Sequence, residues 1–192
     1  MKIVIALDSF KESLTAAAAC DAVARGFRAV LPQAAYHCVP MADGGEGTTA
    51  ALVAARGGKW REVLVQGPLA RPVTARYGRL PDGSAVMEMA EAAGLHLLAP
   101  AERNPRLTST FGVGEMLRHA LAGGTRHIIL GIGGSATNDG GAGMLQALGV
   151  RLLDEKGSEL PRGGVALSRL ARADFSDEDG SFRLGQPISV EF

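Results

Sequence analysis

The residues of this chain with the clearest capacity for chemistry form a glycine-rich segment at residues 131–143. It reads Gly-Ile-Gly-Gly-Ser-Ala-Thr-Asn-Asp-Gly-Gly-Ala-Gly and lies between apolar runs at 127–130 and 144–148, an order typical of strand, loop and helix. Glycine tolerates positive φ and leaves the backbone open, so several N–H groups can turn toward one anion. We therefore expect this loop to hold a phosphate or a carboxylate. The residues expected to contact the anion are Gly133, Gly134, Ser135, Thr137, Asn138 and Asp139.

The same segment resembles two known phosphate-binding patterns only in part. No lysine follows the glycines, which excludes the GxxxxGK[ST] loop. Residues 131–136 satisfy GxGxx[GA], but the acidic partner expected about 20 residues later would be Asp154 or Glu155. Both come where the chain is expected to turn after an apolar run at 150–153. A dinucleotide-binding fragment is therefore an alternative that rests on this one pattern.

A second glycine-rich segment reads Asp-Gly-Gly-Glu-Gly-Thr at residues 43–48. It follows a strand-like run at 36–39 and precedes a helix expected to end at Arg56, before Gly57-Gly58. A short apolar strand at 2–7 leads in the same way into residues 8–11. If the two strands are parallel, both loops leave the same edge of the sheet. The polar residues that would then surround one opening are Asp8, Ser9, Lys11, Asp43 and Glu46.

These residue types suit a reaction at a phosphate. Carboxylates beside a phosphate commonly hold magnesium, and a lysine there neutralises the phosphate as a point charge. Taken singly, Asp8 and Asp43 are equally compatible with turn and cap chemistry, and Lys11 with a solvated loop charge. Three such residues on converging loops favour a site.

The elements around these loops follow from apolar spacing and chain breakers. A cap at Ser13 or Thr15 starts a helix that Pro32 ends; its apolar positions are Cys20, Val23, Ala24, Phe27, Val30 and Leu31. Residues 59–89 alternate like antiparallel strands with a turn at 81–84, and helical spacing resumes at 111–121. Gly67-Pro68-Leu69 interrupts the alternating pattern and is a candidate boundary between two domains. We therefore expect residues 1–66 to be part of a Rossmann-like parallel layer and residues 67–192 part of a second α/β domain.

Composition excludes several classes of function. Among 192 residues, 20 basic and 20 acidic side chains cancel, and no cluster of Lys and Arg interleaved with aromatics occurs, so a nucleic-acid partner is not expected. No signal peptide or run of membrane-spanning length is found. Cys20 and Cys38 lack metal-ligand spacing, which favours burial in a reducing compartment. We therefore expect a cytoplasmic protein that acts on a small molecule.

Taken in order, these motifs closely resemble the type I glycerate kinases over about residues 1–175. The matching blocks are Met1–Ala6 with Asp8–Lys11, Ala42–Thr48, Leu107–Thr110 with Gly112–Glu115, and Gly131–Gly143. The resemblance implies transfer of the γ-phosphoryl group of ATP, with Mg²⁺, to a hydroxyl of D-glycerate, most often the 2-hydroxyl. It also implies a fold in which the second α/β domain is inserted into the first. A homodimer is a further expectation.

The resemblance assigns roles to the loop residues named above. Asp8, Lys11 and Asp43 are the expected catalytic residues, with Asp43 also the expected Mg²⁺ ligand. Which of Asp8 and Asp43 accepts the hydroxyl proton stays open. Arg103 or Arg106 could pair with the glycerate carboxylate. The residues expected to bind substrate or phosphate, besides those of the 131–143 loop, are Ser9, Gly44, Gly45 and Glu46.

The chain also departs from the family pattern. Family members continue with an Asp followed by Asn-Pro, a Gly-Pro-Gln-Lys segment and a Gly-Glu-Gly-Arg loop, and none of these occurs here. We therefore expect both domains to be incomplete in this chain. The alternative function is a catalytically inactive remnant that still binds glycerate or another anion.

Overall fold

The computed structural model describes residues 1–10, 13–176 and 189–191. Lys11, one of the expected catalytic residues, lies outside the described residues. The strands are β1 (Lys2–Ile5), β2 (Ala35–Cys38), β3 (Lys59–Gln66), β4 (Pro72–Arg79), β5 (Ala85–Glu88), β6 (His127–Gly131), β7 (Arg151–Leu153), β8 (Arg172–Asp174) and β9 (Ser189–Glu191). The α-helices are α1 (Ala16–Val30), α2 (Thr48–Arg56), α3 (Ala90–Ala93), α4 (Phe111–Ala122) and α5 (Ala142–Ala147), with 3₁₀ turns at Leu95–Leu97, Pro100–Glu102 and Gly164–Arg169.

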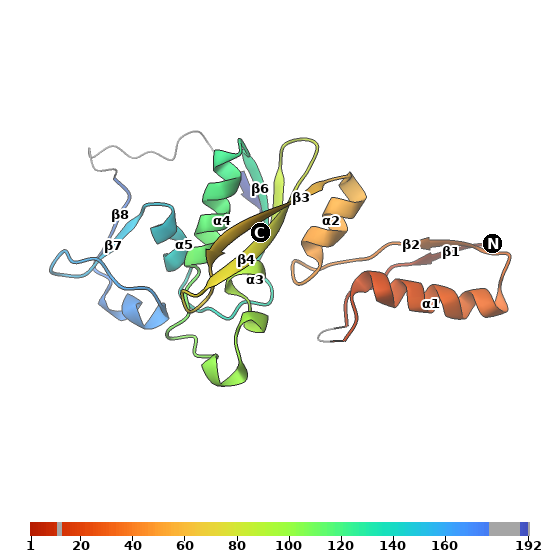
Figure 1. The fold of residues 1–192 in the computed structure, drawn as a ribbon, viewed down its shortest axis with the longest axis horizontal. Coiled ribbons are helices and arrows are strands. Elements are labelled where there is room, and N and C mark those ends of the chain that lie inside the picture. The colour runs from red at the N-terminus through yellow and green to blue at the C-terminus, as the bar shows by residue number, and fades with distance from the viewer. Residues whose placement is uncertain (11–12, 177–188, 192) are drawn as a thin grey trace.

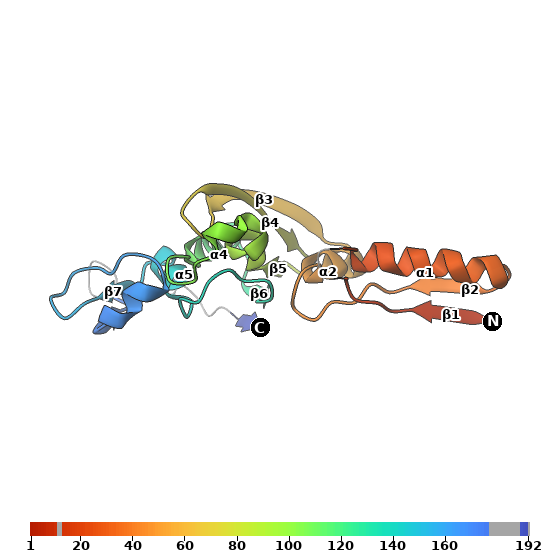
Figure 2. The same cartoon turned by 90° about the horizontal axis from the view of Figure 1, so that it is seen from below.

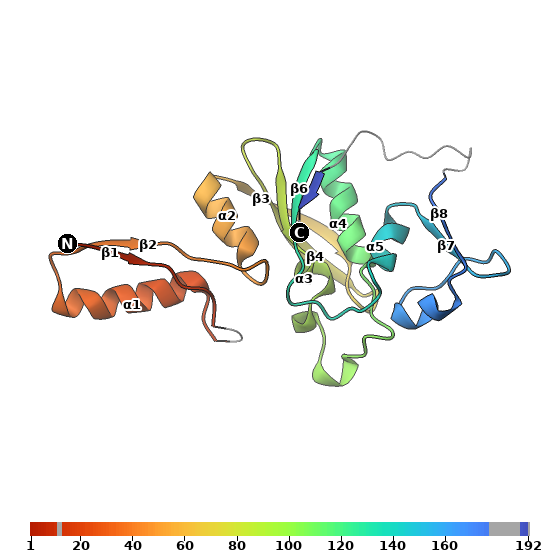
Figure 3. The same ribbon diagram turned by 180° about the vertical axis from the view of Figure 1, so that it is seen from behind.

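The molecule is elongated, with a mixed sheet in its middle (Figure 1). This sheet has the strand order β3-β4-β5-β6-β9, antiparallel from β3 to β5 and parallel from β5 to β9. The unit β1-α1-β2 projects from one end of the molecule, and the small β7-β8 sheet lies at the other end (Figures 1 and 2). Viewed from behind, β9 lies beside β6 at the sheet's edge (Figure 3). The expected α/β class is confirmed.

The β1-α1-β2 unit forms as the sequence predicts. The hydroxyl of Thr15 accepts a hydrogen bond from the Ala18 N–H at 3.2 Å and so caps α1, and the helix ends at Val30, two residues before Pro32. β1 and β2 pair in parallel, from Lys2 with Ala35 to Ile5 with Cys38. The condition for converging loops is therefore met.

The apolar face of α1 is only half covered. Cys20 and Ala24 pack with Ile5 and are buried, whereas Phe27 is 46% and Val30 77% exposed. The cause is the width of the sheet, because two strands cannot cover a whole helical face. For the same reason the expected burial of both cysteines is wrong for Cys38, which is exposed on the outer strand.

The central core forms between the mixed sheet and α4. Tyr77, Met87, Met116 and Ile128 are almost fully buried in it. On the other face, α2 approaches β4 so closely that a Cβ at Gly78 would meet a methyl of Val53 at 2.2 Å. The prediction of strands over residues 59–89 is confirmed, and the packing of α2 against this sheet follows from the missing side chain at Gly78.

The predicted boundary between residues 66 and 67 falls within the β3–β4 hairpin. β3 pairs with β4 along its whole length, from Lys59 with Arg79 to Gln66 with Pro72. The Gly67 N–H donates to the Arg71 carbonyl at 2.7 Å, which closes the connecting loop. Gly67-Pro68-Leu69 is thus a turn between paired strands, and the domain division stays a prediction.

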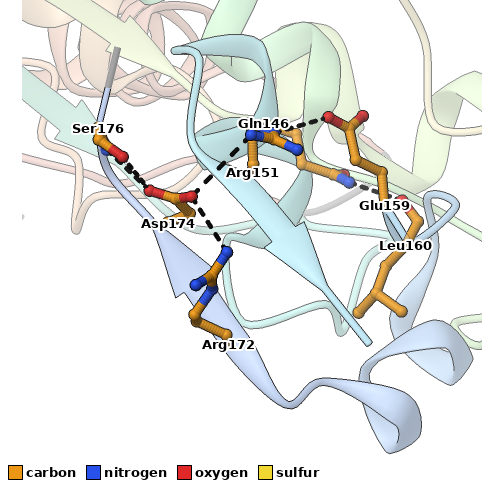
Figure 4. A network of polar contacts seen from close by, with 7 residues as sticks. All are labelled: Gln146, Arg151, Glu159, Leu160, Arg172, Asp174 and Ser176. Atoms are coloured by element: carbon orange, nitrogen blue, oxygen red, sulfur yellow. Dashed lines mark hydrogen bonds and ion pairs between the residues drawn. The ribbon is translucent and has the colours of Figure 1, made fainter. Parts of the chain in front are cut away.

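The β7-β8 sheet is held by a network around Asp174 and Arg151 (Figure 4). Arg151 pairs with Glu159 at 3.1 Å and Arg172 with Asp174 at 3.5 Å.

A dinucleotide-binding unit would place the strand after the 131–143 loop beside β6. Here β7 pairs with β8 in a separate sheet, and the carboxylate of Asp154 accepts hydrogen bonds within a turn. The arrangement gives the dinucleotide alternative no support.

In the described part of the chain, none of the helices is long and apolar enough to cross a bilayer.

Candidate functional site

The parallel strands β1 and β2 deliver two loops to one edge. Beyond the ends of the strands, the N–H of Val39 donates to the Ile5 carbonyl at 2.8 Å and that of Met41 to the Leu7 carbonyl at 2.9 Å. This pairing carries the two segments side by side until Asp8 and Ala42. The loops that follow therefore start at the same edge, as the sequence predicts.

The two glycine-rich loops are in direct backbone contact. The Gly133 N–H donates to the Gly44 carbonyl at 3.1 Å. A Cβ at Gly133 would meet the Cα of Gly45 at 2.5 Å, and one at Gly131 would meet the Gly44 oxygen at 2.7 Å. Glycine is therefore required at residues 131 and 133 because a second backbone occupies the space of the side chain. Two segments far apart in the sequence become one surface.

The loop at residues 43–47 is ordered by its own hydrogen bonds. Gly44 and Gly47 have φ of 92° and 94°, in the left-handed region that favours glycine. The Thr48 hydroxyl accepts from the Gly44 N–H at 3.1 Å and donates to the Gly45 carbonyl at 2.8 Å. The Asp43 carboxylate accepts from the Gly45 N–H at 3.1 Å. One carboxylate oxygen of Asp43 is thus used to shape the loop, and its side chain is exposed.

Glu88 anchors this loop to the central sheet. It is the last residue of β5, it is 7% exposed, and its carboxylate accepts from the N–H groups of Gly47 at 3.3 Å and Thr49 at 2.8 Å. Gly47 has no side chain to cap α2, so a carboxylate from another strand takes that place, where the helix dipole favours negative charge. A buried carboxyl side chain therefore already occupies the start of α2.

A cleft of about 690 Å³ opens beside these loops. Its lining includes Ser9 from the first loop, Glu46 and Gly47 from the second, Gly134 from the third, and Glu88. A volume of this size is typical of small-molecule sites. Of the polar residues expected around one opening, Ser9 and Glu46 line this cleft, whereas Asp8 and Asp43 are not part of its described lining. Gly134 of the third loop reaches it as well.

The other residues of the 131–143 loop are used mainly within the protein. The Ser135 hydroxyl accepts from the Thr137 N–H at 3.0 Å and lies 2.7 Å from the Thr137 hydroxyl. The Ala136 N–H donates to the Ala93 carbonyl at 2.7 Å. Asn138 is exposed. The part of this loop that borders the cleft is Gly134, whose φ of 73° brings bare backbone to the surface.

Asp139 is 1% exposed and lies between the first turns of α4 and α5. Its carboxylate accepts from the N–H groups of Thr110 at 2.9 Å, Gly141 at 3.1 Å and Gly143 at 3.2 Å, and from the Thr110 hydroxyl at 3.0 Å. These bonds satisfy the donors at both helix starts. The structure gives Asp139 a capping role, and its expected contact with phosphate stays a prediction.

The remaining expected residues lie on exposed loops. The Asp8 carboxylate accepts from the adjacent Ser9 N–H at 2.6 Å. Arg103 and Arg106 are exposed, and neither is part of the cleft lining in the described structure. In residues 1–10, 13–176 and 189–191, no group of three or more His, Cys, Asp or Glu side chains is arranged to hold a metal ion.

Sequence reasoning missed Glu88 and the pair Trp60 and Arg76, all of which line the cleft. The signal for Glu88 is its place at the end of an apolar strand, the same signal that identified Asp8. Trp60 and Arg76 carry no such signal, because only the pairing of β3 with β4 brings them together. The Arg76 guanidinium lies 4.6 Å from the centre of the Trp60 ring.

The chain is similar to known proteins along nearly its whole length. The model of the glycerate kinase family matches residues 3–186. A glycerate kinase of Bacillus subtilis strain 168 is 56% identical over 184 residues, which are 95% of this chain and 48% of that protein. A glycerate 2-kinase of Escherichia coli K12 is 51% identical over 180 residues, 93% of this chain and 47% of that protein.

A solved structure agrees with these matches. A crystal structure described as glycerate kinase 2 from Salmonella typhimurium LT2 superposes with a TM-score of 0.76 at 53% identity, covering 92% of this chain and 48% of that chain. The chain thus spans about half the length of the curated relatives it matches.

Proposed function

The chain belongs to the glycerate kinase family, and on that premise we propose that its cleft binds ATP and D-glycerate and transfers the γ-phosphoryl group to the 2-hydroxyl of glycerate. The observation that supports this most is the contact of Gly133 with Gly44, which joins the two glycine-rich loops beside one cleft. A phosphotransferase needs such a site, because its main tasks are positioning and charge stabilisation.

The proposed reaction forms a bond from the glycerate hydroxyl oxygen to the γ-phosphorus and breaks the bond from that phosphorus to the β,γ-bridging oxygen. ADP leaves, and a carboxylate takes the hydroxyl proton. Asp8 and Asp43 are the two candidates for this base, since both are exposed carboxylates on the converging loops. Their hydrogen bonds to the N–H groups of Ser9 and Gly45 fix one oxygen of each.

Magnesium fits the donors that this edge provides. Mg²⁺ prefers oxygen ligands and is commonly held by one or two carboxylates together with waters and phosphates. Asp43 offers such an oxygen on a loop fixed to Glu88 through Gly47. When bound, the ion would neutralise charge on the phosphate oxygens. We assign Asp43 as its holder and Lys11 as the cation on a phosphate.

The proposal also covers the cellular compartment, the class of substrate and the oligomeric state. We propose small-molecule substrates, because the charges of the chain cancel and no basic, aromatic-rich tract occurs. We propose the cytoplasm as the compartment, because two cysteines without metal-ligand spacing suit a reducing environment. A homodimer, and pairing of Arg103 or Arg106 with the glycerate carboxylate, stay predictions.

The proposal is tested by identifying the product. The chain is incubated with ATP, Mg²⁺ and D-glycerate, and phosphorus NMR follows the formation of ADP and 2-phosphoglycerate. L-glycerate and excess chelator serve as controls and are expected to give no product. Saturable binding of D-glycerate without any phosphoglycerate would overturn the kinase and favour the inactive, anion-binding alternative.

A further inference from the structure

The cleft continues along α2, away from the glycine-rich loops. Besides Gly47, it is lined by Ala50, Ala51 and Ala54 of this helix. Ala54 lies about 10 Å from Gly47 along the helix axis, because an α-helix rises about 1.5 Å per residue. The cleft therefore has a polar end at Gly47 and a second end, about two helical turns away, where α2 presents only methyl groups.

Trp60 lies at this second end. It is paired with Gly78 across the β3–β4 ladder, and Gly78 is the residue against which Val53 of α2 packs. Trp60 and Arg76 both line the cleft there. This part of the lining thus offers an indole ring, alanine side chains and the ion pair of Arg76 with Glu91, which lines the cleft as well.

The Arg76 guanidinium lies over the Trp60 ring, and this contact defines the Trp60–Arg76 unit. The Arg76 guanidinium lies 4.6 Å from the centre of the indole ring. Its Nε pairs with the Glu91 carboxylate at 3.3 Å, and the Arg76 N–H donates to the same carboxylate at 3.2 Å. Glu91 therefore gives Arg76 an ion-pair partner beside the indole ring. What this unit offers a ligand is a flat, polarisable surface rather than an attractive charge for phosphate.

We propose that the Trp60–Arg76 unit, with the alanine side of α2, binds the adenine base of the nucleotide by stacking. This inference rests on the proposed kinase function. Aromatic rings and guanidinium planes both stack on bases. A charged three-carbon acid such as glycerate is less well matched, because the Arg76 guanidinium is already paired with Glu91 and the alanines offer a carboxylate no hydrogen bond. With the base at Trp60, the triphosphate extends along the cleft toward the backbone of Gly134.

Trp60 is the only tryptophan of the chain, so its fluorescence reports directly on this surface. Adenosine, ADP, tripolyphosphate and D-glycerate are titrated separately into the intact chain. Adenosine and ADP are expected to change the emission in a saturable way. Tripolyphosphate and D-glycerate, whose binding is followed by calorimetry, are expected to leave the emission unchanged.

Variants separate stacking from general effects on the fold. Trp60→Ala is expected to raise the Kd of adenosine and ADP about tenfold or more, while the Kd of tripolyphosphate stays at the parent value. Trp60→Phe, which keeps a flat ring, should restore much of the affinity. Leu64→Ala is the matched control, since Leu64 lies on the same face of β3 and is 71% exposed. It should leave every Kd unchanged, and thermal melts should show that all variants fold.

The outcomes distinguish this inference from the kinase proposal. If Trp60→Ala binds adenosine as tightly as the parent, or if the parent binds no adenosine, the base site is wrong even when phosphoglycerate forms. If adenosine binding depends on Trp60 but no phosphoglycerate forms, the base site stands and the transfer reaction fails.

Discussion

The backbone N–H of Gly133 donates a hydrogen bond to the carbonyl of Gly44 at 3.1 Å. This bond joins the loop after β6 to the loop that precedes α2. Because both partners are backbone groups, the contact depends on how closely the chains approach and not on a side chain. The absence of a Cβ at residue 133 permits that approach, since a Cβ there would lie 2.5 Å from the Cα of Gly45.

Gly133→Ala should force the two loops apart. We expect the free energy of unfolding to fall by about 1–3 kcal/mol through overpacking, together with weaker nucleotide binding measured by calorimetry. Gly26→Ala is the control: Gly26 lies in α1 with nothing within 4 Å of its Cβ position. It should raise stability by about 0.5–1 kcal/mol. Unchanged stability and affinity in Gly133→Ala would contradict the role given to this contact.

Glu88→Gln tests the anchor of the acidic loop. The amide keeps the shape of the side chain but turns an N–H₂ group toward one of the N–H donors of Gly47 and Thr49. Denaturant unfolding should show a loss of about 1–3 kcal/mol, the cost of leaving a buried donor unpaired. Glu62→Gln, an exposed change on β3, should stay within about 0.5 kcal/mol of the parent. Equal stability of the two variants would refute the anchor.

Asp139→Asn distinguishes helix capping from phosphate binding. The amide accepts fewer of the four hydrogen bonds that reach the carboxylate, so the free energy of unfolding should drop by about 1–3 kcal/mol while tripolyphosphate affinity changes little. Asp154→Asn, in an exposed turn, is expected to cost about 1 kcal/mol or less. Lost affinity at parent-like stability in Asp139→Asn would instead assign this carboxylate to the ligand, as the sequence predicts.

Asp174 should make stability depend on acid pH. Hydrogen bonds from Ser176, and then the charges of Arg172 and Arg151, lower the pKa of this carboxyl below 3.8. A lowered folded-state pKa stabilises the protein above the unfolded-state value, and this contribution disappears as the pH falls through the folded-state value. Urea midpoints of Asp174→Asn should therefore vary less than those of the parent below about pH 4. Parallel curves for the two proteins would exclude this contribution.

Local signals in the sequence predicted much of the fold. Thr15 and Pro32 bound α1, and Gly57 ends α2 in a left-handed conformation. The shared edge of the loops after β1 and β2 was also predictable, because parallel strands deliver their loops to one edge. The contact of the 43–47 loop with the 131–143 loop was not, because β2 and β6 belong to separate sheets. These features depend on neighbours in the chain or on a general rule of sheet topology.

Features that depend on distant partners were not predictable. Glu88 caps a helix that begins 40 residues earlier in the sequence. Asp139 was predicted to contact phosphate from its residue type, but its carboxylate oxygens accept hydrogen bonds from N–H groups at the starts of α4 and α5. The turn at Gly67-Pro68-Leu69 has the composition of a linker, but β3 and β4 pair across it. The core around Ile5 ends with β2 and the packing of α2 against β4 begins after it, but the domain division itself stays a prediction.

The central claim is that the joined loops form the active site of a glycerate kinase. The kcat of the Asp43→Asn variant tests this claim most directly. The rate of phosphoglycerate formation is measured for the parent, for Asp43→Asn and for Asp154→Asn, at saturating ATP, Mg²⁺ and D-glycerate. We predict Mg²⁺-dependent product from the parent and from Asp154→Asn. In Asp43→Asn, kcat should fall about 100-fold or more, because the variant alters the proposed Mg²⁺ ligand and one of the two candidates for the base, with KM for glycerate changed only a few-fold. No product from the parent, or an unchanged kcat in Asp43→Asn, would contradict the account.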